Sequence, residues 1–143
     1  MNELKIKKLD EYLPNIDYAT SGSAGIDLRS SEKKVVPVGE IVLVKTGIII
    51  EIPEGFEGQI RPRSGLALKS GITVLNSPGT IDSDYRNEVG VILMNLGMKD
   101  FNIEFGDRIA QLVISKYEKC NIVLCDNLTA SSTRSGGFGS TGV

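Results

Sequence analysis

The chain has 143 residues, of which 41% are hydrophobic and 24% are charged, and its formal net charge is −2. This composition predicts one folded domain and excludes an intrinsically disordered protein. A weakly acidic chain with scattered basic residues also argues against a nucleic-acid-binding protein, which needs a basic stripe. No run reaches the ~18 to 20 apolar residues of a membrane span or signal core, so we expect a cytoplasmic protein without a membrane partner.

Short apolar runs rich in Val and Ile recur along the chain, and Gly, Pro or Asn interrupts them every ~8 to 12 residues, which is typical of β-strands. Alternation of period 2 at 102–105 indicates a half-buried strand, whereas the continuous apolar runs 48–50 and 91–94 indicate strands buried on both faces. In chain order, we expect strands within 4–9, 33–38, 41–52, 58–63, 72–76, 89–95, 101–105, 108–117 and 121–125.

Helical spacing is sustained only at 64–69, where Ser64 would cap the start of a short helix and Gly71 would follow its end. These elements together favour an all-β fold, a jelly-roll-like sandwich or barrel with at most one short helix. The two cysteines, Cys120 and Cys125, lie in an apolar run without histidine, so we expect structural, reduced thiols rather than a zinc site or a disulfide.

The composition changes from residue 129 onward, where Gly, Ser and Thr dominate and Phe138 is the single large apolar residue. Such a segment cannot offset its ordering entropy alone. It is either a disordered tail or a segment that orders over a ligand, and composition leaves both open. We expect a β-barrel domain over 1–130 and a flexible C-terminal arm over 131–143.

Four polar or glycine-rich stretches separate the expected strands, at 21–30, 61–67, 76–86 and 106–111. Taken singly, each has a structural explanation; Gly25 and Gly65 could serve turns, and Asp27 could cap a backbone. Taken together with the tail, the segments AGIDL, PRSGLA, GTIDSDYR, GDRIAQ and RSGGFGSTG resemble, in order, the five signature motifs of the trimeric dUTPase family. One departure is Asn87, where the family often has Gly, and Asn tolerates positive φ better than most residues.

The resemblance implies an enzyme that hydrolyses dUTP to dUMP and pyrophosphate with Mg²⁺, limiting uracil incorporation into DNA and supplying dUMP for dTMP synthesis. It places the attacking water on Asp82, and a carboxylate is the natural base in a chain without histidine. Asp84 would point to the opposite side of an extended segment, and a turn-capping role is favoured for it. Asp27 would contact the magnesium through water, or orient neighbours, and no direct metal ligand is expected.

The resemblance also implies which residues bind each part of the substrate. A β-hairpin over 74–91 would read uracil, and the aromatic ring of Tyr85 would pack beneath deoxyribose and exclude a 2′-hydroxyl. Arg86 and Arg108 are interpreted as ion-pairing, structural residues. The full set of expected substrate-binding residues is Arg63, Ser64, Gly65, Asn76, Gly79, Tyr85, Gln111, Arg134, Phe138, Gly139, Ser140 and Thr141.

Two alternatives to a simple dUTPase are a dCTP deaminase and a regulatory binding protein. A dCTP deaminase, or a bifunctional deaminase and dUTPase, would need a glutamate acting on C4 of the base. The tyrosine of DSDYR and the complete fifth motif favour dUTPase. A regulatory binding protein would keep the fold and lose catalytic positions, and none is lost, although an added regulatory protein partner stays open. The resemblance finally implies a homotrimer with three sites at subunit interfaces, each closed by a tail from another subunit.

Overall fold

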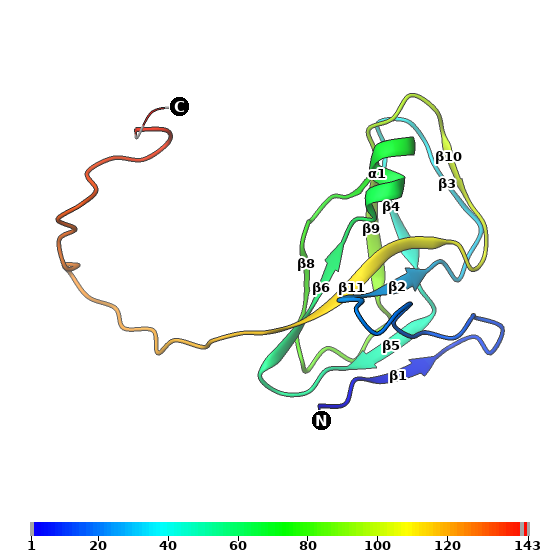
Figure 1. Cartoon of the computed structure of the whole chain (residues 1–143), viewed down its shortest axis with the longest axis horizontal. Helices are drawn as coiled ribbons and strands as arrows, with labels where there is room; N and C mark the ends of the chain where they lie inside the picture. Colours follow the sequence, from blue (N-terminus) through cyan, green and yellow to red (C-terminus); the bar gives the residue numbers. More distant parts are fainter. Residues whose placement is uncertain (1, 141, 143) are drawn as a thin grey trace.

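The computed structural model describes residues 2–140 and 142, and antiparallel strands make up nearly all of its regular structure (Figure 1). The elements are β1 (Lys5–Lys8), β2 (Gly25–Arg29), β3 (Lys34–Val36), β4 (Ile41–Lys45), β5 (Ile48–Glu51), β6 (Phe56–Arg61), α1 (Ser64–Ser70), β7 (Ile72–Val74), β8 (Gly79–Ile81), β9 (Gly90–Asn95), β10 (Phe101–Ile103) and β11 (Arg108–Lys116). They form a four-stranded sheet in the order β2-β11-β6-β8, a three-stranded sheet β4-β9-β7, and the pairs β1-β5 and β10-β3. This arrangement confirms the predicted all-β class with one short helix.

The core consists almost entirely of Val, Ile and Leu side chains that point inward from these strands. In β9, Val91 and Leu93 are fully buried, whereas Ile92 and Met94 on the other face are only half-buried. Burial of such aliphatic side chains stabilises the fold by about 1.5–3 kcal/mol each. Strand alternation therefore corrects the expectation that 48–50 and 91–94 are buried on both faces; Ile49 likewise faces outward and is half-buried.

The outer face of the β4-β9-β7 sheet is nevertheless apolar. The register places Ile41 opposite Met94 and Leu43 opposite Ile92, and directly opposed residues of antiparallel strands share a face. Ile41 and Leu43 are both exposed. The run at 91–94 is thus apolar on both faces, but a single chain covers only one of them.

Helix α1 begins one residue earlier than expected, at Ser64 rather than after it. Arg63, with φ −95° and ψ 128°, is the N-cap and makes no side-chain cap hydrogen bond, while Ser64 is already helical. The prediction of a Ser64 cap is wrong because the chain leaves β6 in an extended conformation through Arg63. The predicted stop is confirmed, since Gly71 ends the helix in the left-handed conformation with φ 66°.

The expected 74–91 hairpin forms only in part. β7 pairs with β9, but β8, which lies between them in sequence, pairs with the edge of β6 instead. The free backbone edge of β6 thus supplies the hydrogen-bonding partner that a continuous hairpin ladder would have used. The segment connecting β7 to β9 is therefore a broad loop that crosses from one sheet to the other.

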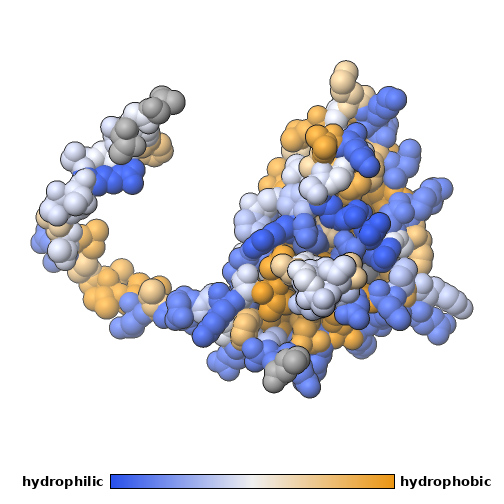
Figure 2. All heavy atoms as spheres, viewed as in Figure 1, coloured by the Kyte–Doolittle hydropathy of each residue, from blue (hydrophilic) through white to orange (hydrophobic). Residues whose placement is uncertain are grey.

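After β11 the chain leaves the barrel as a long arm, residues 117–140, which has no strand or helix among its described residues (Figure 1). The strand expected at 121–125 is absent because no strand of this chain lies beside it to accept its hydrogen bonds. Figure 2 shows hydrophobic atoms along the arm, and the side chains of Ile122 and Leu124 are 86% and 94% exposed. Cys120 and Cys125 are free thiols and both are exposed, so neither contributes to the core of this chain.

The boundary predicted at residue 130 stays a prediction; the last strand of the barrel ends at Lys116. Among the described residues no helix is long and apolar enough to cross a membrane.

Candidate active site

Three of the motif segments meet at one hollow of about 370 Å³ beside β2. We call it the β2 hollow, and the site residues that line it are Gly25, Asp27, Arg63, Ser64, Gly65 and Gln111. The sheet order explains the meeting, because β11 pairs with β2 on one side and β6 on the other. Gln111 therefore lies opposite Asp27 of β2 and opposite Arg61 of β6, and the chain runs from β6 directly into Arg63.

Asp27 lies between two arginines in this hollow. Its Oδ1 is 3.3 Å from Nε of Arg63, and its Oδ2 is 3.5 Å from Nη1 of Arg108. Nη1 of Arg63 also donates to the carbonyl oxygen of Arg108 at 3.2 Å. The ion-pairing interpretation of Arg108 is thereby confirmed, and Arg86 likewise lies 3.9 Å from a carboxylate oxygen of Glu51. These contacts hold the Arg63 guanidinium at the wall of the hollow.

Gln111 is fixed by a single strong contact. Its Nε2 donates to the carbonyl oxygen of Pro62 at 2.8 Å, which ties β11 to the turn that precedes α1. Ser64 and Gly65, in the first turn of that helix, are exposed beside it. A guanidinium, a hydroxyl and an amide around one hollow are suited to an anion that has several oxygens.

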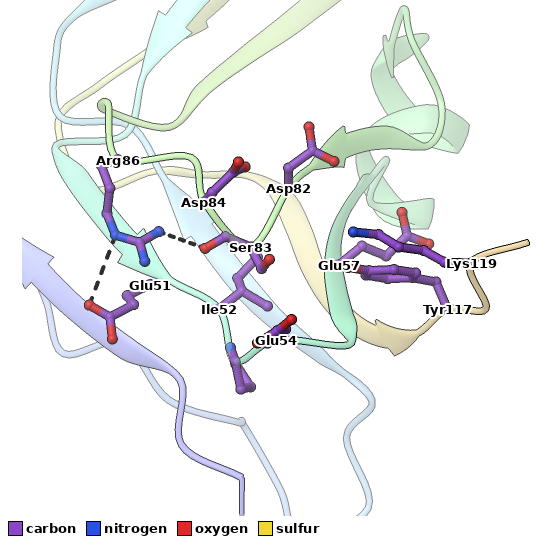
Figure 3. A pocket seen from close by; sticks show the side chains of 11 residues that line it. Glu51, Ile52, Glu54, Glu57, Asp82, Ser83, Asp84, Arg86, Tyr117 and Lys119 are labelled. Carbon is purple, nitrogen blue, oxygen red and sulfur yellow. Dashed lines mark hydrogen bonds and ion pairs between the residues drawn. The ribbon is translucent and has the colours of Figure 1, made fainter. Parts of the chain in front are cut away.

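The predicted base lies at a second, larger hollow of about 830 Å³, which we call the Asp82 hollow (Figure 3). The segment turns here, because the backbone N–H of Tyr85 donates to the carbonyl oxygen of Asp82 at 3.1 Å. Asp82 and Asp84 consequently line the same hollow, which corrects the expectation that they point to opposite sides. No turn-capping hydrogen bond of Asp84 occurs within the part of the chain that the structure describes. Glu54 adds a further carboxylate to this hollow.

Three further expected site residues, Asn76, Gly79 and Tyr85, line neither of these two hollows. Tyr85 is 37% exposed and donates its hydroxyl to the carbonyl oxygen of Glu88 at 3.0 Å, so it is not a core tyrosine. Asn76 is exposed, and Gly79 is buried beneath it. A β-carbon added at Gly79 would lie 3.1 Å from Nδ2 of Asn76, so a side chain there would push the amide aside.

The two hollows share no lining residue within this chain. The predicted phosphate ligands Arg63 and Gln111 are therefore not brought together with the predicted base Asp82. The arm residues Arg134, Phe138, Gly139 and Ser140 belong to neither hollow and are exposed, while Thr141 lies outside the described residues. In the arm, Nε of Arg134 donates to the carbonyl oxygen of Gly136 at 2.9 Å.

The carboxylates do not form a metal-binding cluster: over residues 2–140 and 142, no group of three or more Asp, Glu or Cys side chains could hold an ion. Asp27 already faces two arginines. This donor set fits a magnesium ion that is bound mainly by a polyphosphate and water, with at most a water-mediated contact to Asp27.

Sequence reasoning missed several residues at these sites. Tyr117 and Lys119 line the Asp82 hollow, with Nζ of Lys119 5.7 Å from the centre of the Tyr117 ring. Both come just after the last strand, and no motif in the sequence around them indicates a site. The carbonyl oxygen of Pro62 was also missed, since a backbone acceptor leaves no signal in the residue types.

Comparisons with known proteins agree with this geometry. The dUTPase family model matches residues 11–142. A deoxyuridine 5′-triphosphate nucleotidohydrolase of Rickettsia bellii (strain OSU 85-389) is 56% identical, covering 100% of this chain and 97% of that protein. One of Rickettsia prowazekii (strain Madrid E) is 56% identical over 99% and 97% of the two chains. The solved structure of the Staphylococcus bacteriophage 80alpha dUTPase G164S mutant with dUpNHpp has a TM-score of 0.89 and 26% identity, and each chain is covered fully.

Proposed function

The chain belongs to the dUTPase family, and from this premise we propose that it hydrolyses dUTP to dUMP and pyrophosphate, limiting uracil incorporation into DNA and supplying dUMP for dTMP synthesis. The observation that carries the proposal is the β2 hollow, where residues of three separate motif segments surround a space suited to a polyanion. Cytoplasmic residence stays a prediction.

The chemical step is attack of water on the α-phosphorus. Asp82, an exposed carboxylate, accepts the proton of the water as its oxygen bonds to phosphorus, and the bond from the α-phosphorus to the bridging oxygen breaks. Pyrophosphate leaves with the electron pair of that bond. In a chain without histidine, a carboxylate is the group best able to serve as this base.

The triphosphate is held by the β2 hollow and the arm. dUTP carries about four negative charges and the chain itself a net charge of −2, so binding requires local donors. Arg63, Ser64, Gly65 and Gln111 supply them from the barrel. The arm contributes Arg134, Gly139, Ser140 and Thr141 when it closes. When bound, Mg²⁺ would supply positive charge to the phosphate oxygens, and Asp27 would contact it at most through water.

The nucleoside is selected by the broad loop between β7 and β9 and by the arm. Asn76 and the backbone around Gly79 pair with uracil, and a side chain at position 79 would push the Asn76 amide aside. The ring of Tyr85 packs beneath deoxyribose and excludes a 2′-hydroxyl. Phe138 stacks on the uracil when the arm closes.

The working unit is a homotrimer with sites at its subunit interfaces. Three features support it. The base and the phosphate ligands lie at different hollows of one chain, so a shared site unites them across subunits. The outer face of the β4-β9-β7 sheet is apolar and uncovered, as are Ile122 and Leu124 of the arm, and such surfaces are typical of subunit interfaces.

The substrate assignment is tested by measuring pyrophosphate release from dUTP, dCTP, dTTP and UTP side by side. We expect a strong preference for dUTP, since the loop selects the base while Tyr85 excludes a 2′-hydroxyl on the sugar. Comparable turnover of dTTP or UTP would contradict the proposed selection. Release of ammonia from dCTP would instead indicate a deaminase, because deamination alone yields dUTP and no pyrophosphate.

The base assignment is tested with Asp82→Asn, which keeps size and polarity but removes the proton acceptor. We expect kcat to fall by ~10² to 10⁴ while the Kd of a non-hydrolysable dUTP analogue stays near that of the parent. Asp84→Asn is the matched comparison, because it removes the other carboxylate of the same turn, and its kcat should stay within a few fold. Equal losses in both variants would show that the assignment to Asp82 is wrong.

A further inference from the structure

Gly25 lies in β2 at the wall of the β2 hollow, and the side chain of Gln111 fills the space beside its Cα. Gly25 and Gln111 are diagonal neighbours on one face of the β2-β11 pair, since Gly25 lies opposite Val113 and Gln111 opposite Asp27. A β-carbon added at Gly25 would collide with Oε1 of Gln111 and lie 3.3 Å from its Cδ. The amide thus lies directly across the backbone of β2.

The glycine is not required by the backbone. Gly25 has an ordinary strand conformation and is absent from the glycines with positive φ. Any residue could therefore adopt its φ and ψ, and the contact with Gln111 is what a side chain would violate. The atom struck first is the far end of a flexible side chain, so the amide would move and the strand would stay.

The position of the amide has a chemical consequence. Nε2 of Gln111 donates one of its two N–H bonds to the carbonyl oxygen of Pro62. This bond fixes the orientation of the amide, because a flipped amide would set Oε1 against another acceptor. The second N–H is then available to a phosphate oxygen in the hollow. Displacement by a β-carbon would break the Pro62 bond and move the amide into the space of the substrate.

We propose that Gly25 is a positioning residue of the reaction, whose missing side chain holds Gln111 in the orientation that binds the triphosphate. The inference rests on the proposed function in so far as Gln111 is a phosphate ligand. It predicts that Gly25 acts on substrate binding only through Gln111. The effects of changing the two residues should therefore not be additive.

The test measures kcat, KM for dUTP and the Kd of a non-hydrolysable analogue, all with Mg²⁺, for Gly25→Ala, Gln111→Ala and the double variant. Gly22→Ala is the matched control, since a β-carbon there meets nothing within 4 Å. We expect parental values for the control and a rise of about tenfold or more in KM for each single variant, with a smaller change in kcat. The double variant should be no worse than Gln111→Ala alone.

The inference is overturned by a KM of Gly25→Ala within about twofold of the parent, or by a double variant whose loss is the product of the two single losses. If Gln111→Ala itself keeps the parental KM, the phosphate-ligand assignment fails together with the inference, while preference for dUTP in the parent is judged separately. Thermal unfolding gives an independent readout. Should Gly25→Ala unfold at a lower temperature, removal of the Gln111 amide in the double variant restores it if the clash is with that amide alone, and a failure to restore it counts against the inference.

Discussion

The barrel and the arm use the same apolar residue types with opposite results. Leu93 in β9 is 0% exposed, whereas Leu124 in the arm is 94% exposed. In the barrel, neighbouring strands of the same chain supply both hydrogen bonds and apolar contacts. In the arm the chain supplies neither, although the sequence of 121–125 is as strand-like as that of β9. An apolar run becomes a buried strand only where a partner strand exists, and the described residues of this chain offer none to the arm.

The largest effect is expected from a truncation that removes the end of the arm and keeps the barrel. Truncation after Ala130 should leave the circular dichroism spectrum of the barrel unchanged, because every regular element ends by Lys116. kcat/KM for dUTP should fall by ~10²-fold or more, since the truncation removes the proposed arm contacts to phosphate and base. Normal hydrolysis by the truncated protein would mean that the arm is only a tail.

A matched pair of leucine substitutions compares the regions directly. Leu93→Ala should lower the free energy of unfolding by about 2–5 kcal/mol, because it opens a cavity in a fully buried core. Leu124→Ala should leave the barrel stable and weaken trimer association. Denaturant titration at one protein concentration measures the first, and light scattering after size exclusion on serial dilution measures the second. An equal loss of unfolding free energy in both variants would contradict the difference drawn between the barrel and the arm.

A fluorescent probe can follow closure of the arm. The chain contains no tryptophan, so Phe138→Trp installs a single indole at a side chain that is fully exposed. With a non-hydrolysable dUTP analogue and Mg²⁺, its emission should change saturably and become protected from acrylamide, since stacking on a nucleobase contributes ~1–3 kcal/mol. dCTP serves as the control and should give no change. An indole that stays fully quenchable at saturation would contradict closure.

The smallest effect belongs to a surface contact of the barrel. The backbone N–H of Lys45, at 3.0 Å, and the ammonium of Lys34, at 3.3 Å, hold the pKa of Glu32 below its usual range. A lowered folded-state pKa contributes stability above the ordinary carboxyl pKa of about 4.3, and this contribution is lost as the pH falls through the folded value. Glu32→Gln should therefore lower Tm slightly at pH 7, and the difference should vanish in acid. A difference that persists in acid would assign the effect to packing.

Much of the barrel was predictable because its signals are local. Runs of β-branched residues, Gly71 at the end of a short helix and each of the five motifs are patterns that span only a few residues. The failures came from contacts across the fold. Ser64 has the right type for a cap, but the path of the chain out of β6 decided that Arg63 takes that position. β8 pairs with β6 rather than with β7 or β9, its neighbours in sequence, because β6 has a free edge in the sheet.

The site divides in the same way. Motif resemblance identified Asp27, Arg63 and Gln111, and the structure brings all three to one hollow. It could not indicate that Asp82 faces a different hollow, because a motif records the order of residues and not their positions in space. Nor could it indicate the steric dependence of Gln111 on Gly25, since that contact joins residues on different strands.

The separation of the two hollows has a genetic consequence. In the proposed trimer, each site takes Arg63 from one subunit and Asp82 from another, so a chain damaged at Arg63 and a chain damaged at Asp82 are defective in different halves of a site. Two alleles that are each inactive alone should complement one another when expressed together. With random assembly in equal amounts, about a quarter of the sites would contain both intact halves. A single chain that carries both changes should complement neither.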